Sequence, residues 1–469
     1  MQARKDIPAF VKMAASVAAM IAAMTSCVRE TFEMTMPEEG RKVTVTLPLA
    51  SPGVMETVVT KANTYSNMAS IILFIYNADG TVCEKILETE NGDITLEGGS
   101  EYSDDANSGR LYTARFTATS GVKRICAIGN YEDVTNWEYY DREAHRWGNF
   151  SEYIDRIKTQ AREGMSAAEL GKRVFFLNRV FPENGNTPTF DGWRMISTGA
   201  GNISIDTDGN VTDPATGSEG ILHMERCVAD IQFRITAKAA DNPETGDVDE
   251  SIHNITFSPT SYNIYNIPSG LRLAPGRSYD DNPNEGERPD ESFPEFYFDG
   301  SEKKYFTEVK DEATSTTYTS LQFFMPENIQ KTLTTGVNKD GEPYDFTAAD
   351  DSGYRLRERW NGTDANEEKI WKFAPENGTY VVITGEYSES DENNNHLYSG
   401  TTSYTVHLGD FGPGNWGDFS IRRNHRYIYT VTVSGVNNIK VEATTDNETQ
   451  PGAEGNIIST QDNVTRNYS

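Results

Sequence analysis

The sequence predicts an all-β protein made of β-sandwich or barrel units, and two observations support this prediction. Apolar and polar residues alternate with a period of two in Val43–Leu49, Ile231–Ile235 and Tyr427–Val433. Such alternation places one face of a strand on a core and the other in solvent, as in antiparallel sheets. Turn signals, Asp-Gly or Asn-Gly, separate the short strands at 79–80, 208–209, 340–341 and 377–378. Many short strands with such punctuation are typical of sandwiches and barrels.

The first 27 residues are typical of an export signal. Three basic residues precede an uncharged apolar run at 13–24, and two small residues then lead to Cys27. A basic region, a short apolar region and small residues before the cleavage point describe a secretory signal. The apolar run is too short to cross a bilayer, which takes about 20 residues. Because a cysteine follows directly, we expect 1–26 to be a lipoprotein signal peptide and Cys27 to carry acyl chains, with simple secretion as the alternative.

The composition narrows the class of partner. The formal net charge of the chain is −29 at pH 7, and an acidic surface repels phosphate backbones, so nucleic acid is excluded as a partner. No segment after the signal reaches the ~18 apolar residues that indicate a membrane span. We therefore expect an exported protein that is tethered to a membrane and touches it only through the N-terminal lipid.

The number and spacing of the cysteines do not decide whether they form a disulfide or remain thiols. Lipidation of Cys27 leaves Cys83, Cys126 and Cys227, whose spacing fits no zinc or redox motif. The two interpretations are one disulfide between two of these residues and three buried thiols, which act as small hydrophobes.

One stretch of the chain lacks strand alternation. Residues 150–177 are predicted to be a helical insertion, and Ser166 with Glu169 forms a capping box ahead of Leu170. The polar, turn-rich stretch 206–220 then marks a predicted domain boundary. The resulting division is an N-terminal sandwich domain at 27–220, a C-terminal one at 221–445, and a polar tail at 446–469.

Motifs for catalysis and metal binding do not stand out. None of the six histidines pairs with another at metal-ligand spacing, and no nucleophile elbow, P-loop or dinucleotide fingerprint occurs. We expect no enzyme activity, no cofactor and no metal. The stretch Asp206–Asp213 resembles part of a calcium loop but lacks its length and terminal Glu. Since turn chemistry alone explains Asp and Gly there, a hairpin turn is the favoured interpretation.

An aromatic cluster in a charged setting is the best candidate binding surface in the first domain. It comprises Trp137, Tyr139, Tyr140 and Trp147. Such rings can stack on sugars or anchor a protein interface. The favoured interpretation is that these rings anchor a long connection to the sandwich.

Several segments resemble the fimbrillin-type pilin family of Bacteroidales, the lipoprotein-derived subunits of type V pili. The apolar strand and Asp-Gly turn of IILFIYNADGTV (71–82) are similar to an early family signature. HMERCVADIQFRI (223–235) resembles the opening of the family's C-terminal domain. The most specific segments are FFMPEN (323–328), YVVITGEY (380–387), YTVHLGD (404–410) and the stretch 418–442. They resemble tip or accessory subunits, whereas the insertion at 150–177 departs from the family pattern.

The resemblance implies two tandem transthyretin-like β-sandwiches, a location at the cell outer membrane, either lipid-anchored or in a surface fimbrium, and assembly by strand exchange with other pilus subunits. A protease removes the first strand, and a neighbour's strand fills the groove by β-augmentation. The removable strand is expected at Val43, Val45, Leu47 and Leu49, and the processing site at Lys61, where the family has Arg. Arg41 and Lys42 are less suitable, since cleavage there would spare the strand.

The predicted function is therefore a fimbrial tip or accessory adhesin that binds a host or bacterial surface ligand. The tail offers few apolar anchors for a donor strand, which favours a tip or an anchor over a stalk subunit. The alternative is an outer-membrane glycan-binding lipoprotein, which would use the aromatic cluster. A surface hydrolase is a third hypothesis with less support, because no pattern in the sequence identifies carboxylates that would converge in an active site.

Overall fold

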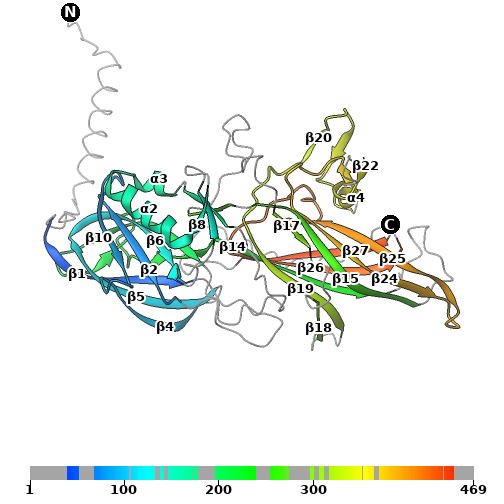
Figure 1. The fold of residues 1–469 in the computed structure, drawn as a ribbon, viewed down its shortest axis with the longest axis horizontal. Coiled ribbons are helices and arrows are strands. Elements are labelled where there is room, and N and C mark those ends of the chain that lie inside the picture. The colour runs from blue at the N-terminus through cyan, green and yellow to red at the C-terminus, as the bar shows by residue number, and fades with distance from the viewer. Residues whose placement is uncertain are drawn as a thin grey trace, which may run out of the picture.

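The computed structural model describes residues 40–51, 68–104, 107–132, 138–141, 146–171, 173–177, 196–238, 254–268, 270–273, 296–299, 306–310, 316–350, 352–363, 369–436 and 438–447. Strands dominate these residues, which confirms the all-β prediction. The molecule is elongated, with β1 to β6, β10 and two helices at one end and the long strands β14 to β27 towards the other (Figure 1). Below, the N-terminal part is 40–226 and the C-terminal part is 228–447.

Two sheets face each other in the N-terminal part. The first has the order β12-β1-β5-β4, formed by Leu222–His223, Lys42–Ser51, Asn107–Thr119 and Thr95–Asp104. The second has the order β11-β10-β6-β2-β3, formed by Val211–Thr212, Ser197–Ile205, Gly121–Gly129, Ile71–Tyr76 and Cys83–Glu88; β13 (Glu225–Arg226) also pairs with β10. Their facing side chains form one apolar core, called the inter-sheet core below.

Strand β2 is buried on both faces, which explains its uninterrupted apolar sequence. Ile71, Leu73 and Ile75 point into the inter-sheet core. The intervening residues Ile72 and Phe74 belong to a second core on the other side of the sheet, with helical residues. A strand covered on both faces has no polar face, so alternation disappears from its sequence.

The second core lies under two helices, α2 (Phe150–Arg162) and α3 (Ala167–Gly171). Helix α2 buries five residues at helical spacing: Phe150, Tyr153, Ile154, Ile157 and Ala161. Its Lys158 lies 3.0 Å from the buried carboxylate of Glu88 on β3. The predicted capping box is confirmed, because the Ser166 hydroxyl accepts the Glu169 N–H at 3.2 Å and the Glu169 carboxylate accepts the Ser166 N–H at 2.8 Å. The predicted helical range 150–177 is too long at its end, since Val174–Leu177 is strand β9.

Three features join the two parts. Strand β16 (Gly270–Arg272) pairs with β9 in a small sheet of order β16-β9-β7-β8, which β7 (Glu138–Asp141) and β8 (Arg146–Asn149) complete. The core under the helices extends to Val228, Leu273 and Phe324 of the C-terminal part. The main-chain N–H of Arg226 in the N-terminal part also donates to the side-chain oxygen of Asn424 in the C-terminal part, at 3.3 Å. Strand pairing, apolar packing and this hydrogen bond therefore hold the two parts together.

The C-terminal part also has two facing sheets. One has the order β18-β19-β14-β26-β27, formed by Thr307–Lys310, Thr317–Pro326, Val228–Ala237, His425–Gly435 and Asn438–Asn447. The other has the order β17-β15-β24-β25, formed by Phe296–Asp299, Asn254–Ile267, Tyr380–Ser390 and His396–His407. Strand β27 ends at Asn447, inside the range predicted as tail.

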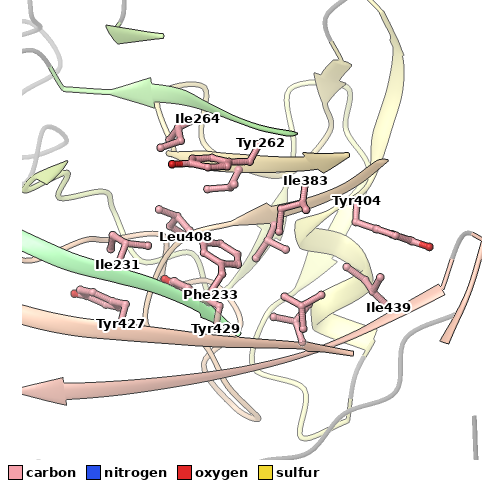
Figure 2. Packing of buried hydrophobic residues seen from close by; sticks show 14 of the residues in the cluster. Ile231, Phe233, Tyr262, Ile264, Ile383, Tyr404, Leu408, Tyr427, Tyr429 and Ile439 are labelled. Atoms are coloured by element: carbon pink, nitrogen blue, oxygen red, sulfur yellow. The ribbon is translucent and has the colours of Figure 1, made fainter. Parts of the chain in front are cut away.

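The predicted inward faces of β14 and β26 are confirmed by the packing between these sheets. Ile231, Phe233, Tyr427 and Tyr429 are fully buried. Figure 2 shows them opposite Tyr262, Ile264 and Ile383 of the other sheet. The rings of Phe233 and Tyr429 stack with centroids 5.1 Å apart. Alternation in the sequence thus maps directly onto one core.

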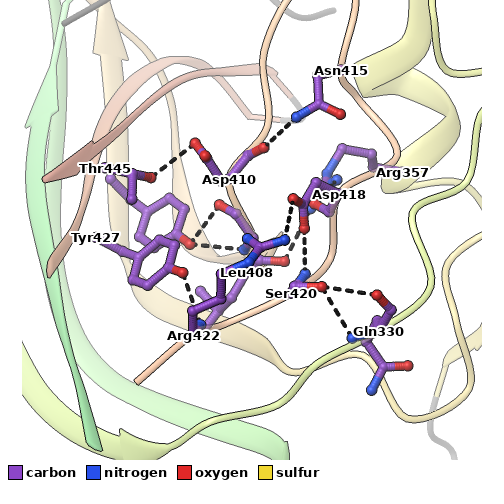
Figure 3. Close-up of polar contacts among 12 residues, drawn as sticks. Gln330, Arg357, Leu408, Asp410, Asn415, Asp418, Ser420, Arg422, Tyr427 and Thr445 are labelled. Carbon is purple, nitrogen blue, oxygen red and sulfur yellow. Dashed lines mark hydrogen bonds and ion pairs between the residues drawn. The ribbon is translucent and has the colours of Figure 1, made fainter. Parts of the chain in front are cut away.

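Two long connections interlock at one end of this sandwich. Between β19 and β24 the chain forms β20 (Thr335–Val337), β21 (Pro343–Asp345), α4 (Ser352–Arg357), β22 (Trp360–Thr363) and β23 (Lys369–Trp371). The second connection, 408–424, joins β25 to β26. The indole N–H of Trp416 donates to the Ala348 carbonyl at 2.8 Å, and the Leu333 N–H donates to the Gly417 carbonyl at 3.0 Å. Figure 3 shows Arg357, Asp418, Ser420 and Gln330 within this network.

Candidate functional site

Strand β1 contains the residues that the sequence singled out as a removable strand. It pairs antiparallel with β5 along its whole length, from Lys42 opposite Thr119 to Ser51 opposite Arg110. Val43 is 9% exposed, and Val45, Leu47 and Leu49 are 0% exposed. These four side chains enter the inter-sheet core. Thr44 and Thr46 point to the exposed face, as period-2 geometry requires.

The other edge of β1 is much less fully paired. Leu49 and Ala50 form a short parallel ladder with Leu222 and His223 of β12. The Met224 N–H donates to the Ala50 carbonyl at 2.9 Å, and the Thr46 N–H donates to the Gly209 carbonyl at 3.3 Å. β1 is thus a strand next to a sheet edge, covered there by a two-residue strand and a turn.

Pro48 fits this position. The carbonyl of Arg41 accepts a bond from Ser120, next to β5, whereas the N–H of Thr46 points to the opposite edge. Since successive residues direct their main-chain groups to alternate edges, the nitrogen of Pro48 also faces away from β5. The missing proline N–H therefore removes no bond of the β1–β5 ladder, as expected of proline beside a sheet edge.

The turn that covers β1 is Asp206–Asn210, between β10 and β11. The Asp206 carboxylate accepts the N–H groups of Asp208 and Asn210, both at 2.8 Å, and the Asn210 side-chain amide at 2.8 Å. Slight burial raises the pKa of Asp206, but these hydrogen bonds outweigh it and hold that pKa below its usual value. All of these contacts belong to a hairpin turn, the interpretation favoured for this stretch. Within the described ranges, no cluster of three or more His, Cys, Asp or Glu side chains is placed to hold a metal ion.

The aromatic cluster is only partly described. Strands β7 and β8 form an antiparallel hairpin in which Tyr140 is directly opposite Trp147, and Tyr139 is opposite Gly148. Trp137 lies outside the described residues, as do Cys27 and Lys61. The structure therefore brings Tyr140 and Trp147 to one cross-strand position, at the small sheet that joins the two parts.

Cys83, Cys126 and Cys227 are free thiols. Cys126 and Cys227 are buried, and Cys83 is half-buried. Burial raises the pKa of Cys126 to about 11, so this thiol stays protonated at neutral pH. The sequence left open either one disulfide or three thiols, and in the structure all three cysteines are thiols.

The structural roles of two residues, Gly209 and Arg357, were not identified from the sequence. Gly209 was recognised as part of a turn, but its contact with β1 joins segments far apart in the chain. Arg357, fully buried at 0% exposure, belongs to a residue type that is mostly exposed. The only local signal was the Asp-Gly pair at 208–209; nothing in the sequence around Arg357 marked it.

No helix within the described part of the chain is both long and apolar enough to cross a membrane. Comparison with known proteins gives one family match: residues 323–431 match a model described as Domain of unknown function (DUF4906). No curated protein matches the chain.

Solved structures give further matches. The tip fimbrial protein Mfa3 from Porphyromonas gingivalis, with a C-terminal truncation, is 11% identical with a TM-score of 0.40, over 86% of this chain and 99% of that one. A candidate cell adhesion protein from Parabacteroides distasonis is 11% identical with a TM-score of 0.43, over 88% and 100%. A fimbrial assembly protein from the same species is 8% identical with a TM-score of 0.35, over 86% and 95%. These are Bacteroidales fimbrial and adhesion proteins, the group that the sequence segments resemble.

Proposed function

We propose that this chain is a cell-surface fimbrial subunit, of tip or accessory type, that is exported as a lipoprotein and assembled by strand exchange. The observation that carries the proposal is β1: a strand beside a sheet edge whose alternate side chains fill the inter-sheet core. The segment resemblance at 71–82, 223–235, 323–328, 380–387, 404–410 and 418–442 supports the same assignment. In this proposal the two facing-sheet units are tandem transthyretin-like sandwiches, spanning 27–220 and 221–445, with the tail at 446–469.

Removal of β1 would leave a groove beside β5 that is lined by the inter-sheet core, and this groove would be unstable if it stayed empty. Full burial of a Val or Leu side chain stabilises a protein by about 1.5–3 kcal/mol, so the four side chains contribute roughly 6–12 kcal/mol. That figure is similar to the total stability of a typical domain, about 5–15 kcal/mol. A chain that lost β1 would therefore need another strand in its place. A segment of a neighbouring subunit supplies it, through main-chain bonds to β5 and side chains in the vacated positions.

Cleavage after Lys61 would release the lipid at Cys27 and β1 together, because both precede that residue. The tail from 446 has few apolar residues to act as a donor strand, so the subunit receives a strand and sits at a tip, or keeps its lipid as an anchor. We propose other pilus subunits as its assembly partners and a host or bacterial surface molecule as its ligand. Its role is binding and assembly rather than catalysis.

N-terminal sequencing of the protein from purified surface pili tests this proposal. A processed, strand-accepting subunit starts at Ala62, and the variant Lys61→Gln keeps Cys27 as its first residue and stays out of the pili. A start at Cys27 in assembled pili refutes removal of β1 and identifies the lipid as a permanent anchor. Absence of the chain from pili, together with free lipoprotein in the membrane, refutes the fimbrial assignment.

The second candidate function is glycan binding at the aromatic cluster. The observation in its favour is the cross-strand position shared by Tyr140 and Trp147, since paired aromatic residues can present a stacking surface to a sugar. Glycan arrays with the intact chain test it. Binding that is lost in Trp147→Ala and in Trp137→Ala supports this function, and arrays without any bound glycan oppose it.

A further inference from the structure

The outer edge of β1 is contacted at two separate points. Its outward-facing main-chain groups belong to Thr44, Thr46, Pro48 and Ala50. The N–H of Thr46 is bonded to the Gly209 carbonyl, and the carbonyl of Ala50 to the N–H of Met224. Pro48, between these points, has no N–H to donate. The edge is thus bonded at the Thr46 N–H and, farther along the strand, through the short ladder with β12 that ends at Met224.

Gly209 approaches β1 more closely than a residue with a side chain could. A Cβ at this position would lie 1.9 Å from the carbonyl oxygen of Thr44 and 2.9 Å from its carbonyl carbon. Both atoms are main chain, so no side-chain rotation relieves the overlap. The φ angle of Gly209 is +89°, which also favours glycine.

A second glycine provides the contrast. Gly217, in the loop after β11, has a φ of +72°, yet a Cβ there would meet nothing within 4 Å. The two positions share the backbone requirement for glycine and differ in the close approach to β1. The contact at Gly209 is therefore a property of the groove rather than of tight turns in this region.

The turn holds the Gly209 carbonyl in a fixed place. The Gly209 N–H donates to the Asp206 carbonyl at 3.2 Å, and the Asp206 N–H donates to the Asn210 carbonyl at 3.0 Å. On either side of the turn, Ile205 is paired with Val211. Both side chains are buried in the same core as β1. The acceptor is thus attached to the walls of the groove and remains when β1 is replaced.

The sequence of β1 allows only one register at this acceptor. A slip by one residue would turn the threonines into the core. A slip by two residues in one direction would bring Pro48 opposite Gly209, where no N–H is available. The same slip in the other direction would place Arg41 in the buried position of Val43.

We propose that Gly209 and Met224 form a two-point clamp that sets the register of whichever strand fills the groove beside β5. The clamp selects a strand with an N–H at the position of Thr46, a carbonyl facing Met224, and apolar side chains at the positions of Val43, Val45, Leu47 and Leu49. For its partner, a strand of a second subunit, this inference rests on the proposed function. The clamp itself acts on β1 in the intact chain.

Peptide exchange into a nicked protein tests the clamp. A protease site placed within 52–67 of the otherwise full-length chain is cut so that β1 stays bound without a covalent link. A fluorescent peptide with the sequence of residues 40–51 is then added, and its binding is followed by anisotropy. We expect replacement of the Thr46 amide by an ester, which removes this N–H, to weaken binding about fivefold, as loss of one hydrogen bond predicts. The same replacement at Thr44, whose outward N–H forms no hydrogen bond to the turn at 206–210, should change binding less than twofold.

Protein variants give the matched comparison. Gly209→Ala should weaken peptide binding at least tenfold, because it adds the overlap with the strand. Gly217→Ala, with the same backbone strain and open space, should change it less than twofold. Equal binding in the two variants, or equal binding of the two ester peptides, overturns the clamp while leaving strand exchange in place.

A second measurement separates failure of the clamp from failure of the proposed function. If no peptide enters the wild-type nicked protein, strand exchange at this groove is refuted. Hydrogen exchange of the Thr46 amide in the intact chain then decides the clamp alone. Protection that falls in Gly209→Ala and persists in Gly217→Ala supports it, and equal protection in both variants overturns it.

Discussion

Replacement of Arg357 by methionine should destabilise the C-terminal part by several kcal/mol. Its guanidinium donates to the carbonyls of Trp416 and of Asp418, the latter at 2.8 Å. It also donates to the carbonyls of His407 at 3.2 Å and Leu408 at 3.1 Å. Arg357→Met keeps much of the stem volume and removes every one of these bonds.

The expected magnitude follows from opposing terms. A hydrogen bond involving a charged group contributes about 1.5–3 kcal/mol, and four carbonyls would lose their donor. The rings of Phe411 and Phe419, 4.1 and 3.9 Å from the guanidinium carbon, would lose a cation–π partner. Against this, burial of the charge is costly and lowers the pKa of Arg357 to about 10. We expect the free energy of unfolding to fall by about 3–5 kcal/mol, which is the usual cost of removing one partner of a buried charged interaction.

Urea unfolding of the intact chain measures this loss, with tryptophan fluorescence as the signal because Trp416 is fully buried in the same network. Arg357→Lys should recover little, since an ammonium cannot reproduce the planar fork of donors or the stacking. Arg355→Met, at an exposed position of the same helix, is the control and should cost less than about 0.5 kcal/mol. An Arg357→Met midpoint close to that of wild type would refute the reasoning that this side chain links the two connections.

Three further outcomes are expected. Leu47→Ala, at a fully buried position of β1, should cost about 2–5 kcal/mol in urea unfolding, and a loss below 1 kcal/mol would show that β1 contributes little. Gly353→Ala should lower the melting temperature, because a Cβ there would lie 2.1 Å from the Trp416 ring, and unchanged melting would contradict that packing. Burial lowers the pKa of His425 below its unfolded value of about 6.5, so its unfolded form takes up a proton first and stability falls as the pH drops below that value. Between pH 7 and pH 5, His425→Gln should therefore lose less stability than the wild type, as measured by urea midpoints. Parallel pH profiles of the two proteins would contradict this role of His425.

The strands of the two sandwiches were largely predictable because their signal is local. Alternation in Val43–Leu49 predicted both the strand and its buried face, and the structure agrees at each of the four apolar positions. The unbroken apolar run of Ile71–Tyr76 belongs to a segment identified from the sequence as an apolar strand, and the helices on its second face explain why no polar residues interrupt it. The capping box at Ser166 was likewise readable, since its partners are three residues apart.

What the sequence could not supply are contacts between distant segments. The pairing of β9 with β16 brings Phe176 opposite Gly270, and no local pattern indicates this. The position of Arg357 depends on four carbonyls of the connection 408–424 and its neighbours, which only the folded chain assembles. For the groove, the apolar face was predictable, but the acceptor at Gly209 was not.

The helical insertion has a physical role if β1 is exchanged. β1 contributes to the inter-sheet core, whereas the core under α2 and α3 and the core of the C-terminal part contain none of its residues. When β1 leaves, β2 and β6 therefore lose cover on one face only. Their other face stays packed under the helices, where Lys158 pairs with the buried carboxylate of Glu88. The insertion would thus keep the second sheet folded while the groove beside β5 is empty. This sheet carries the turn with Gly209.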